Sequence, residues 1–224
     1  METASYILFA AFLIVVGVGA AIGNSRRARF NSALSKAAPL VGLSYREGNA
    51  AIDEAERDAA DEGPAALKIP RVLTRFFGGG VTPCLAGEYK GVHVKVFSES
   101  GSPGGGKPAE TTWRAYYRRP LHFKLRAVSR HSTDEQPQAS SELEFTLGDE
   151  EFDAKVRLES DDMVEARAFL AESNRRQALL AGFSAYPSIV VRKASVVCKR
   201  LIAEPSPKEI QAVLDSIVGI ARTF

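Results

Sequence analysis

The chain of 224 residues is poor in the residue types that build disulfide frameworks and metal centres. Its two cysteines, Cys84 and Cys198, are far apart and match no spacing that is typical of a metal site. Its three histidines are isolated from the cysteines and from one another. The sequence therefore predicts no metal and no cofactor, and it predicts that Cys198, in the apolar run VVCKRLI, is a small buried residue.

The chain also lacks an excess of either charge. The 29 lysines and arginines nearly balance the 27 aspartates and glutamates, which leaves a formal net charge of +2. Dedicated nucleic-acid binders are usually strongly basic, so no nucleic-acid partner is expected. No Ser/His/Asp or Cys/His set stands at a diagnostic spacing, and the phosphate-loop-like string Gly101–Lys107 is followed by Pro108 in place of a hydroxyl residue. The sequence thus predicts a protein that is not an enzyme.

One long apolar run is present near the start of the chain, YILFAAFLIVVGVGAAI over residues 6–22. About 20 such residues, rising ~1.5 Å each as a helix, span the ~30 Å of hydrocarbon in a bilayer. The run therefore predicts a short tail over 1–5, a transmembrane helix over 6–23, a juxtamembrane helix and linker over 24–63, and a cytoplasmic domain over 64–224. A cleaved signal peptide is the alternative, but the acidic start and the arginines directly after the run favour an anchor.

The flanks of this run predict its orientation and its neighbours. Arg26, Arg27 and Arg29 follow the run, whereas no lysine or arginine precedes it, so the domain is expected on the cytoplasmic side. Gly19 and Gly23 form a G-x-x-x-G pattern with Ala20 beside Gly19, and small residues on one helix face let a second helix approach closely. These three residues are the predicted helix-packing interface. The ordinary abundance of glycine in membrane helices is the alternative explanation.

The rest of the chain alternates between strand and helix patterns, which predicts an α+β fold. The expected architecture is a single N-terminal transmembrane helix followed by a mostly antiparallel sheet of roughly six to eight strands with two packing helices. Ser206, Pro207 and Glu209 form a capping box that should open the terminal helix. The expected strands are 84–98 as a pair turning near Glu88–Gly91, 111–119 paired with 121–128, 142–147, about 152–159, and the pair 188–194 and 195–202; the other helix is expected over 163–183.

A basic and aromatic stretch, WRAYYRRPLHFKLR over 113–126, is the predicted contact surface. Cations beside aromatic rings suit an acidic partner surface or anionic lipid headgroups. The predicted contact residues are Trp113, Arg114, Arg118 and Arg119, together with Arg26, Arg27 and Arg29. The alternative is a sheet whose basic side simply faces solvent.

The stretch LGDEEFDAKVRLESDDMVEARAFL over 147–170 resembles the signature of an uncharacterised bacterial membrane-anchored family. The resemblance implies the α+β architecture and a bacterial setting, and it assigns no activity. Together with the apolar run and its basic flank, this setting gives the bacterial cytoplasmic (inner) membrane as the expected location. Val156 departs from the pattern, since an aromatic residue is common there. The residues that carry the resemblance are Gly148, Asp149, Phe152, Asp153, Val156, Leu158, Ser160, Asp162, Glu165, Ala166, Arg167 and Leu170.

These observations favour a non-catalytic accessory subunit of a larger bacterial membrane complex, for example an energy-converting respiratory or photosynthetic one. Its expected partners are the lipid bilayer and other integral membrane proteins. The alternative function is a membrane-tethered binding module for an anionic lipid or a small ligand.

Overall fold

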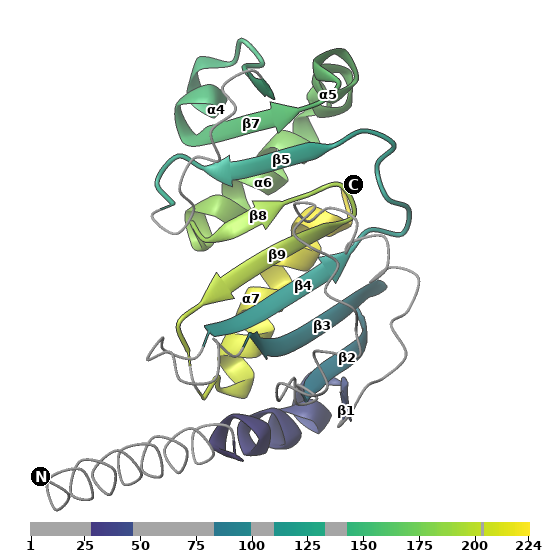
Figure 1. Cartoon of the computed structure of the whole chain (residues 1–224), viewed down its shortest axis with the longest axis vertical. Helices are drawn as coiled ribbons and strands as arrows, with labels where there is room; N and C mark the ends of the chain where they lie inside the picture. The colour runs from purple at the N-terminus through teal and green to yellow at the C-terminus, as the bar shows by residue number, and fades with distance from the viewer. Residues whose placement is uncertain (1–27, 47–82, 100–109, 133–142, 203) are drawn as a thin grey trace, which may run out of the picture.

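The central feature of the computed structural model, which describes residues 28–46, 83–99, 110–132, 143–202 and 204–224, is one nine-stranded sheet (Figure 1). Its strand order is β1-β2-β3-β4-β9-β8-β5-β7-β6, and every neighbouring pair is antiparallel. The strands are β1 (Ser44–Arg46), β2 (Cys84–Tyr89), β3 (Val92–Glu99), β4 (Glu110–Tyr116), β5 (Leu125–Ser129), β6 (Glu144–Phe145), β7 (Val156–Ser160), β8 (Ile189–Val191) and β9 (Ser195–Arg200).

Helices pack on one face of this sheet. In Figure 1, α6 and α7 run behind the strands, and α7 contacts β3, β4 and β9. Successive side chains of a strand point to opposite faces, so Val96, Trp113 and Cys198 share the helix-covered face. The helices are residues 28–41, α4 (Glu150–Lys155), α5 (Met163–Leu170), α6 (Ser173–Ala185) and α7 (Pro207–Ala221).

The terminal helix α7 supplies much of the core. Its N-terminus is the predicted capping box: the Ser206 hydroxyl accepts from the Glu209 backbone N–H, and the Glu209 carboxylate accepts from the Ser206 N–H. Its apolar side meets α6 at Gly182, where a Cβ would lie only 2.5 Å from Cδ1 of Ile220. A glycine at this position therefore allows the two helices to cross at close range. The buried residues of α7 are Ile210, Val213, Leu214, Ile217, Val218, Ile220 and Ala221.

The predicted fold needs correction at its N-terminal end. Within the residues that the structure describes, no helix combines the length and the apolar character that a membrane crossing requires. The predicted span 6–23 lies outside the described residues, as do its packing residues Gly19, Ala20 and Gly23. Residues 28–46, expected to precede the domain, belong to it instead. Phe30 and Leu34 of the helix are buried in the main core, and β1 joins the edge of the sheet.

The sheet itself also differs from the prediction. It has nine strands, and more than two helices pack around it. Strands β4 and β5 were expected to pair with each other, but the β8–β9 hairpin lies between them. The expected strand near 152–159 begins as helix α4, and the expected helix over 163–183 is divided into α5 and α6 around Ala171 and Glu172. Local patterns in the sequence do not specify these long-range arrangements.

The β2–β3 hairpin turns where the sequence predicted. Lys90 and Gly91 form its two-residue loop with φ of 51° and 82°, the positive values that such tight hairpin turns require. The Asp215 carboxylate of α7 accepts hydrogen bonds from the Tyr89 hydroxyl at 2.8 Å and the Lys90 ammonium at 2.7 Å. Burial acts to raise the pKa of Asp215, but these two hydrogen bonds outweigh it and lower the pKa. Asp215 thus attaches α7 to the hairpin.

This attachment predicts a loss of stability in acid. Because the pKa of Asp215 is lower in the folded than in the unfolded chain, its contribution is complete above the unfolded value of about 4 and disappears as the pH falls through the folded value. Asp215→Asn should therefore lower the free energy of unfolding at pH 7 by about 1 kcal/mol or less, since the pair is partly exposed and screened. Urea unfolding of both proteins at pH 7 and pH 3 measures the difference in their free energies of unfolding. The same difference at both pH values would contradict a stabilising role for the Asp215 carboxylate.

Candidate functional site

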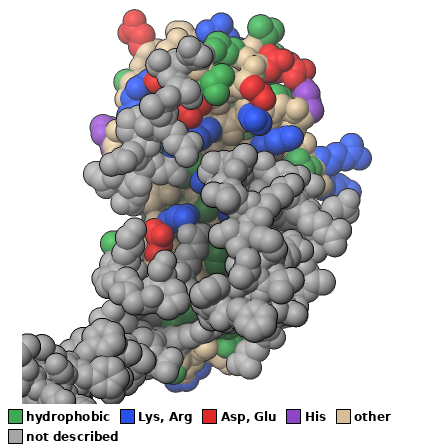
Figure 2. Space-filling model, viewed as in Figure 1, with side chains coloured by type: hydrophobic (Ala, Val, Ile, Leu, Met, Phe, Trp, Pro, Cys, Tyr) green, Lys and Arg blue, Asp and Glu red, His purple; other side chains and the backbone are tan. Residues whose placement is uncertain are grey.

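One end of the sheet carries a cluster of cations, which we call the basic tip: Arg118, Arg119, Lys124 and Lys193. The first three lie on the connection from β4 to β5, and Lys193 lies on the turn from β8 to β9. Figure 2 shows Lys and Arg side chains projecting from the side of the molecule where Figure 1 places the β4–β5 connection. Two segments that are distant in the sequence thus form one basic surface.

Backbone hydrogen bonds hold the tip in place. The Tyr117 N–H donates to the Ala194 carbonyl at 3.0 Å, and the Leu121 N–H donates to the Lys193 carbonyl at 2.9 Å. Tyr117 and Leu121 are themselves buried, so the two arginines between them are presented to solvent by a fixed backbone. The tip is therefore preorganised, which reduces the entropy lost on binding a partner.

The cations of the tip have no counterion among the described residues, a property that they share with isolated cations such as Lys36 and Lys208. Among the described residues, no carboxylate forms an ion pair with any of the four side chains of the tip. Two nearby acidic side chains are engaged in other ways: Asp161 accepts from the backbone N–H of Lys124 at 2.7 Å rather than from its ammonium, and Glu165 pairs with His122. Cations with carboxylate partners elsewhere include Lys90, Arg126, Arg130, Lys155, Arg157, Arg175 and Arg176.

The other end of the sheet has a notch with a pocket of about 360 Å³. Strand β8 has three residues, whereas its neighbour β9 continues for two more residues to Arg200. Pro187 precedes β8 at the place where a residue would pair with Arg200, and proline has no N–H to donate to the ladder. The ends of β5 and β9 are therefore left apart, and the side chain of Arg200 lines the space between them.

The structure separates the residues that the sequence grouped as a contact surface. Trp113 is fully buried on the helix-covered face, so its side chain has no surface to offer a partner. Arg114 is half-buried on the opposite face, since adjacent residues of a strand alternate. Arg118 and Arg119 remain exposed in the basic tip. Arg29 is exposed elsewhere, 3.7 Å from Glu204, and Arg26 and Arg27 lie outside the described residues.

The residues that carry the family resemblance have structural roles here. The side chains of Asp149 and Asp162 cap α4 and α5 by accepting from the backbone N–H groups of Phe152 and Glu165. The Asp153 carboxylate accepts from the N–H groups of Leu147 and Gly148 at 3.0 and 2.9 Å. The other members with a buried side chain are Phe152, Val156, Leu158, Ser160, Ala166 and Leu170. This segment is accounted for by helix capping and core packing, so it does not itself indicate a site.

Neither cysteine is exposed, and no metal site is found among the described residues. Cys84 and Cys198 are both buried, which confirms the prediction for Cys198. Burial raises the pKa of the Cys198 thiol to about 11, so the thiol stays protonated and unreactive near neutral pH. Among the described residues, no three His, Cys, Asp or Glu side chains gather closely enough to hold a metal ion.

The fold resembles that of a protein of known structure. No protein-family model and no curated protein sequence matches the chain. The crystal structure of the mycobacterial trehalose monomycolate transport factor A, TtfA, superimposes with a TM-score of 0.51 over 88% of this chain and 93% of that one. The two sequences are 9% identical, so this likeness shows the fold alone. By its name, the protein that shares the fold is a transport factor rather than an enzyme.

Proposed function

We propose that the protein is a non-catalytic accessory factor that binds an acidic surface of a partner protein in a bacterial complex through its basic tip. The observation that carries the proposal is the absence of counterions at Arg118, Arg119, Lys124 and Lys193 among the described residues. Exposed cations attract an acidic partner and orient it during association. The fixed backbone of the tip favours one docking geometry.

One further consideration supports an accessory role. The transport factor that shares the fold is named for its part in moving trehalose monomycolate, and a comparable auxiliary role suits a chain whose tip is built for binding. The expected location at the bacterial cytoplasmic membrane stays a prediction, which cell fractionation tests directly.

A charge reversal tests the proposal. Arg118→Glu combined with Arg119→Glu should weaken the partner complex tenfold or more, because like charges then face each other across the interface. The measurement is the yield and dissociation constant of the partner identified by crosslinking to the native protein. Binding by the unaltered protein should also weaken as salt rises, since the screening length is about 10 Å at 0.1 M.

A matched control separates this effect from a change in net charge. Lys36→Glu combined with Lys208→Glu makes the same change at exposed positions of the helix 28–41 and of α7, and it should leave the complex intact. If the charge-reversed variant Arg118→Glu, Arg119→Glu recovers the same partner in the same yield, the proposal is refuted. Tip-dependent binding to phosphatidylglycerol vesicles, with no protein partner, would instead identify an anionic lipid as the target.

A further inference from the structure

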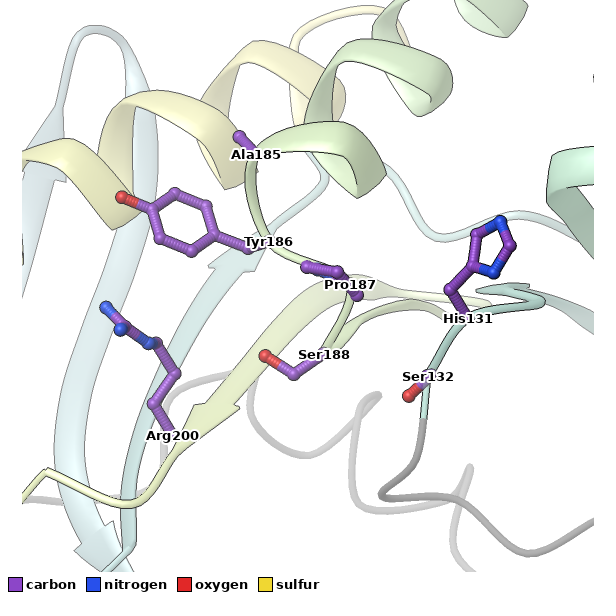
Figure 3. Close-up of a pocket in the computed structure, with 7 residues that line it drawn as sticks. All are labelled: His131, Ser132, Ala185, Tyr186, Pro187, Ser188 and Arg200. Atoms are coloured by element: carbon purple, nitrogen blue, oxygen red, sulfur yellow. The ribbon is translucent and has the colours of Figure 1, made fainter.

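The notch between β5 and β9 differs from the basic tip in position and in shape. It lies at the opposite end of the strands, and it is concave, whereas the tip projects. Figure 3 shows Arg200 rising from β9 toward the ring of Tyr186, with the Ser188 hydroxyl pointing to the same side and His131 and Ser132 across from them.

Arg200 supplies the charge of this site. Its guanidinium lies 5.4 Å from the centre of the Tyr186 ring, a cation–π contact that orients it without neutralising it. No carboxylate forms an ion pair with Arg200 within the described residues. The nearby Glu209 is already engaged, since it accepts hydrogen bonds from the N–H and the hydroxyl of Ser206 at 2.9 and 2.7 Å. The guanidinium donors therefore remain available to a ligand.

The other lining residues are also donors or neutral groups. Ser132, Ser188 and Tyr186 offer hydroxyls, of which that of Ser188 also hydrogen-bonds with the Cys198 sulfur at 3.5 Å, and His131 offers an imidazole. The described lining contains no carboxylate. A smaller pocket of about 110 Å³ shares Ser132 and is lined by Arg130 and Arg157, whose charges are balanced by Glu144 and Glu159, so Arg200 is the uncompensated charge of the two pockets among the described residues. A surface that presents donors and positive charge is complementary to an oxyanion.

The size of the notch limits its ligand. About 360 Å³ is at the small end of the range of about 300–1,000 Å³ for small-molecule sites. The forked guanidinium of arginine matches the geometry of phosphate oxygens, and the Tyr186 ring with Pro187 gives an apolar wall for an organic group. We propose that the notch binds the phosphate group of a small phosphomonoester, with Arg200 as its principal contact.

Titration of the full chain with inorganic phosphate and with glycerol 3-phosphate, followed by amide NMR, tests this site. Both probes should shift the signals of Ser132, Ser188 and Arg200 in a saturable manner, and glycerol 3-phosphate should bind more tightly if the apolar wall contributes. Arg200→Gln should weaken binding roughly ten- to a hundredfold, because hydrogen bonds to charged groups are among the strongest. Arg222→Gln, at the other end of α7, should leave binding unchanged.

Several outcomes would overturn the proposal. These are the absence of saturable shifts in the unaltered protein, unchanged binding by folded Arg200→Gln, or shifts confined to Arg118 and Arg119. Equal binding of acetate would refute the preference for phosphate. If Arg200→Gln does not fold, Arg200→Lys and Ser188→Ala serve in its place: each should weaken phosphate binding severalfold, since one loses the fork and the other a hydroxyl. Unchanged affinity in both would be equally decisive against the site.

Discussion

Trp113→Ala should lower the free energy of unfolding by about 3–5 kcal/mol, the range for truncating a buried tryptophan. Trp113 is fully buried on the helix-covered face of β4, where it packs in the main core between the neighbouring strands and α7. Such a loss is a large share of the ~5–15 kcal/mol that stabilises a typical domain. Urea unfolding should show a lower midpoint with an unchanged slope.

A second substitution separates packing from polarity at this position. The indole Nε1 of Trp113 is buried and has no hydrogen-bond partner among the residues that the structure describes. Trp113→Phe removes this unsatisfied donor while keeping a ring, so it should cost much less than Trp113→Ala, because an unpaired buried donor itself costs about 1–3 kcal/mol. A cost of Trp113→Phe that approaches the cost of Trp113→Ala would contradict the view that the N–H group is unsatisfied. A folded Trp113→Ala protein of unaltered stability would contradict the assignment to the core.

Arg175→Ala should lower the free energy of unfolding by about 2–4 kcal/mol, from lost charged hydrogen bonds and a lost cation–π contact. The Arg175 guanidinium donates to the carbonyls of Phe169 and Thr223 at 2.6 and 2.9 Å, and it lies 3.8 Å from the centre of the Phe169 ring. It therefore joins the end of α5, the start of α6 and the C-terminus of the chain. Thermal unfolding followed by circular dichroism measures the loss.

The control for Arg175 is on the same helix. Gln177 is exposed on α6, so Gln177→Ala should change stability by no more than about 0.5 kcal/mol. The loss of stability in Arg175→Lys should lie between those of Arg175→Ala and Gln177→Ala, since lysine keeps the charge but lacks the forked guanidinium that reaches both carbonyls. If Arg175→Lys is as stable as the unaltered protein, the charge alone accounts for the effect and the two carbonyl bonds contribute nothing.

The sequence correctly predicted those elements that depend on a few adjacent residues. The Lys90–Gly91 turn needs positive φ values that glycine adopts readily, and the capping box of α7 is a pattern within four residues. The division of 163–183 into two helices was missed because Arg175 and Arg176 stabilise the end of α5 from outside that helix, through the carbonyls of Phe169, Leu170 and Ala171. Tertiary hydrogen bonds of this kind have no periodicity that a sequence pattern reveals.

The basic tip and the notch were predicted only in part, for a similar reason. Arg118 and Arg119 stand out in the sequence as an adjacent basic pair. Lys193 was missed because the β8–β9 turn reaches the β4–β5 connection only through the strand order of the sheet. Arg200 was missed because it lines a pocket only where β8 stops short of it. In the sequence, Pro187 is the residue that could have indicated the end of that strand.

The place of the β8–β9 hairpin in the sheet constrains how the chain folds during synthesis. Strands β1 to β4 form one group of neighbours in the sheet, and β5, β6 and β7 form another. The two groups of strands are joined only by the β8–β9 hairpin, residues 189–200, which pairs with β4 on one side and with β5 on the other. A ribosome releases both groups before it makes the hairpin that joins them. Each group has an exposed strand edge until then, which makes the nascent chain prone to mispairing until residues 189–200 have emerged. Folding of this protein is therefore completed late, by insertion of a central strand pair rather than by growth from one end.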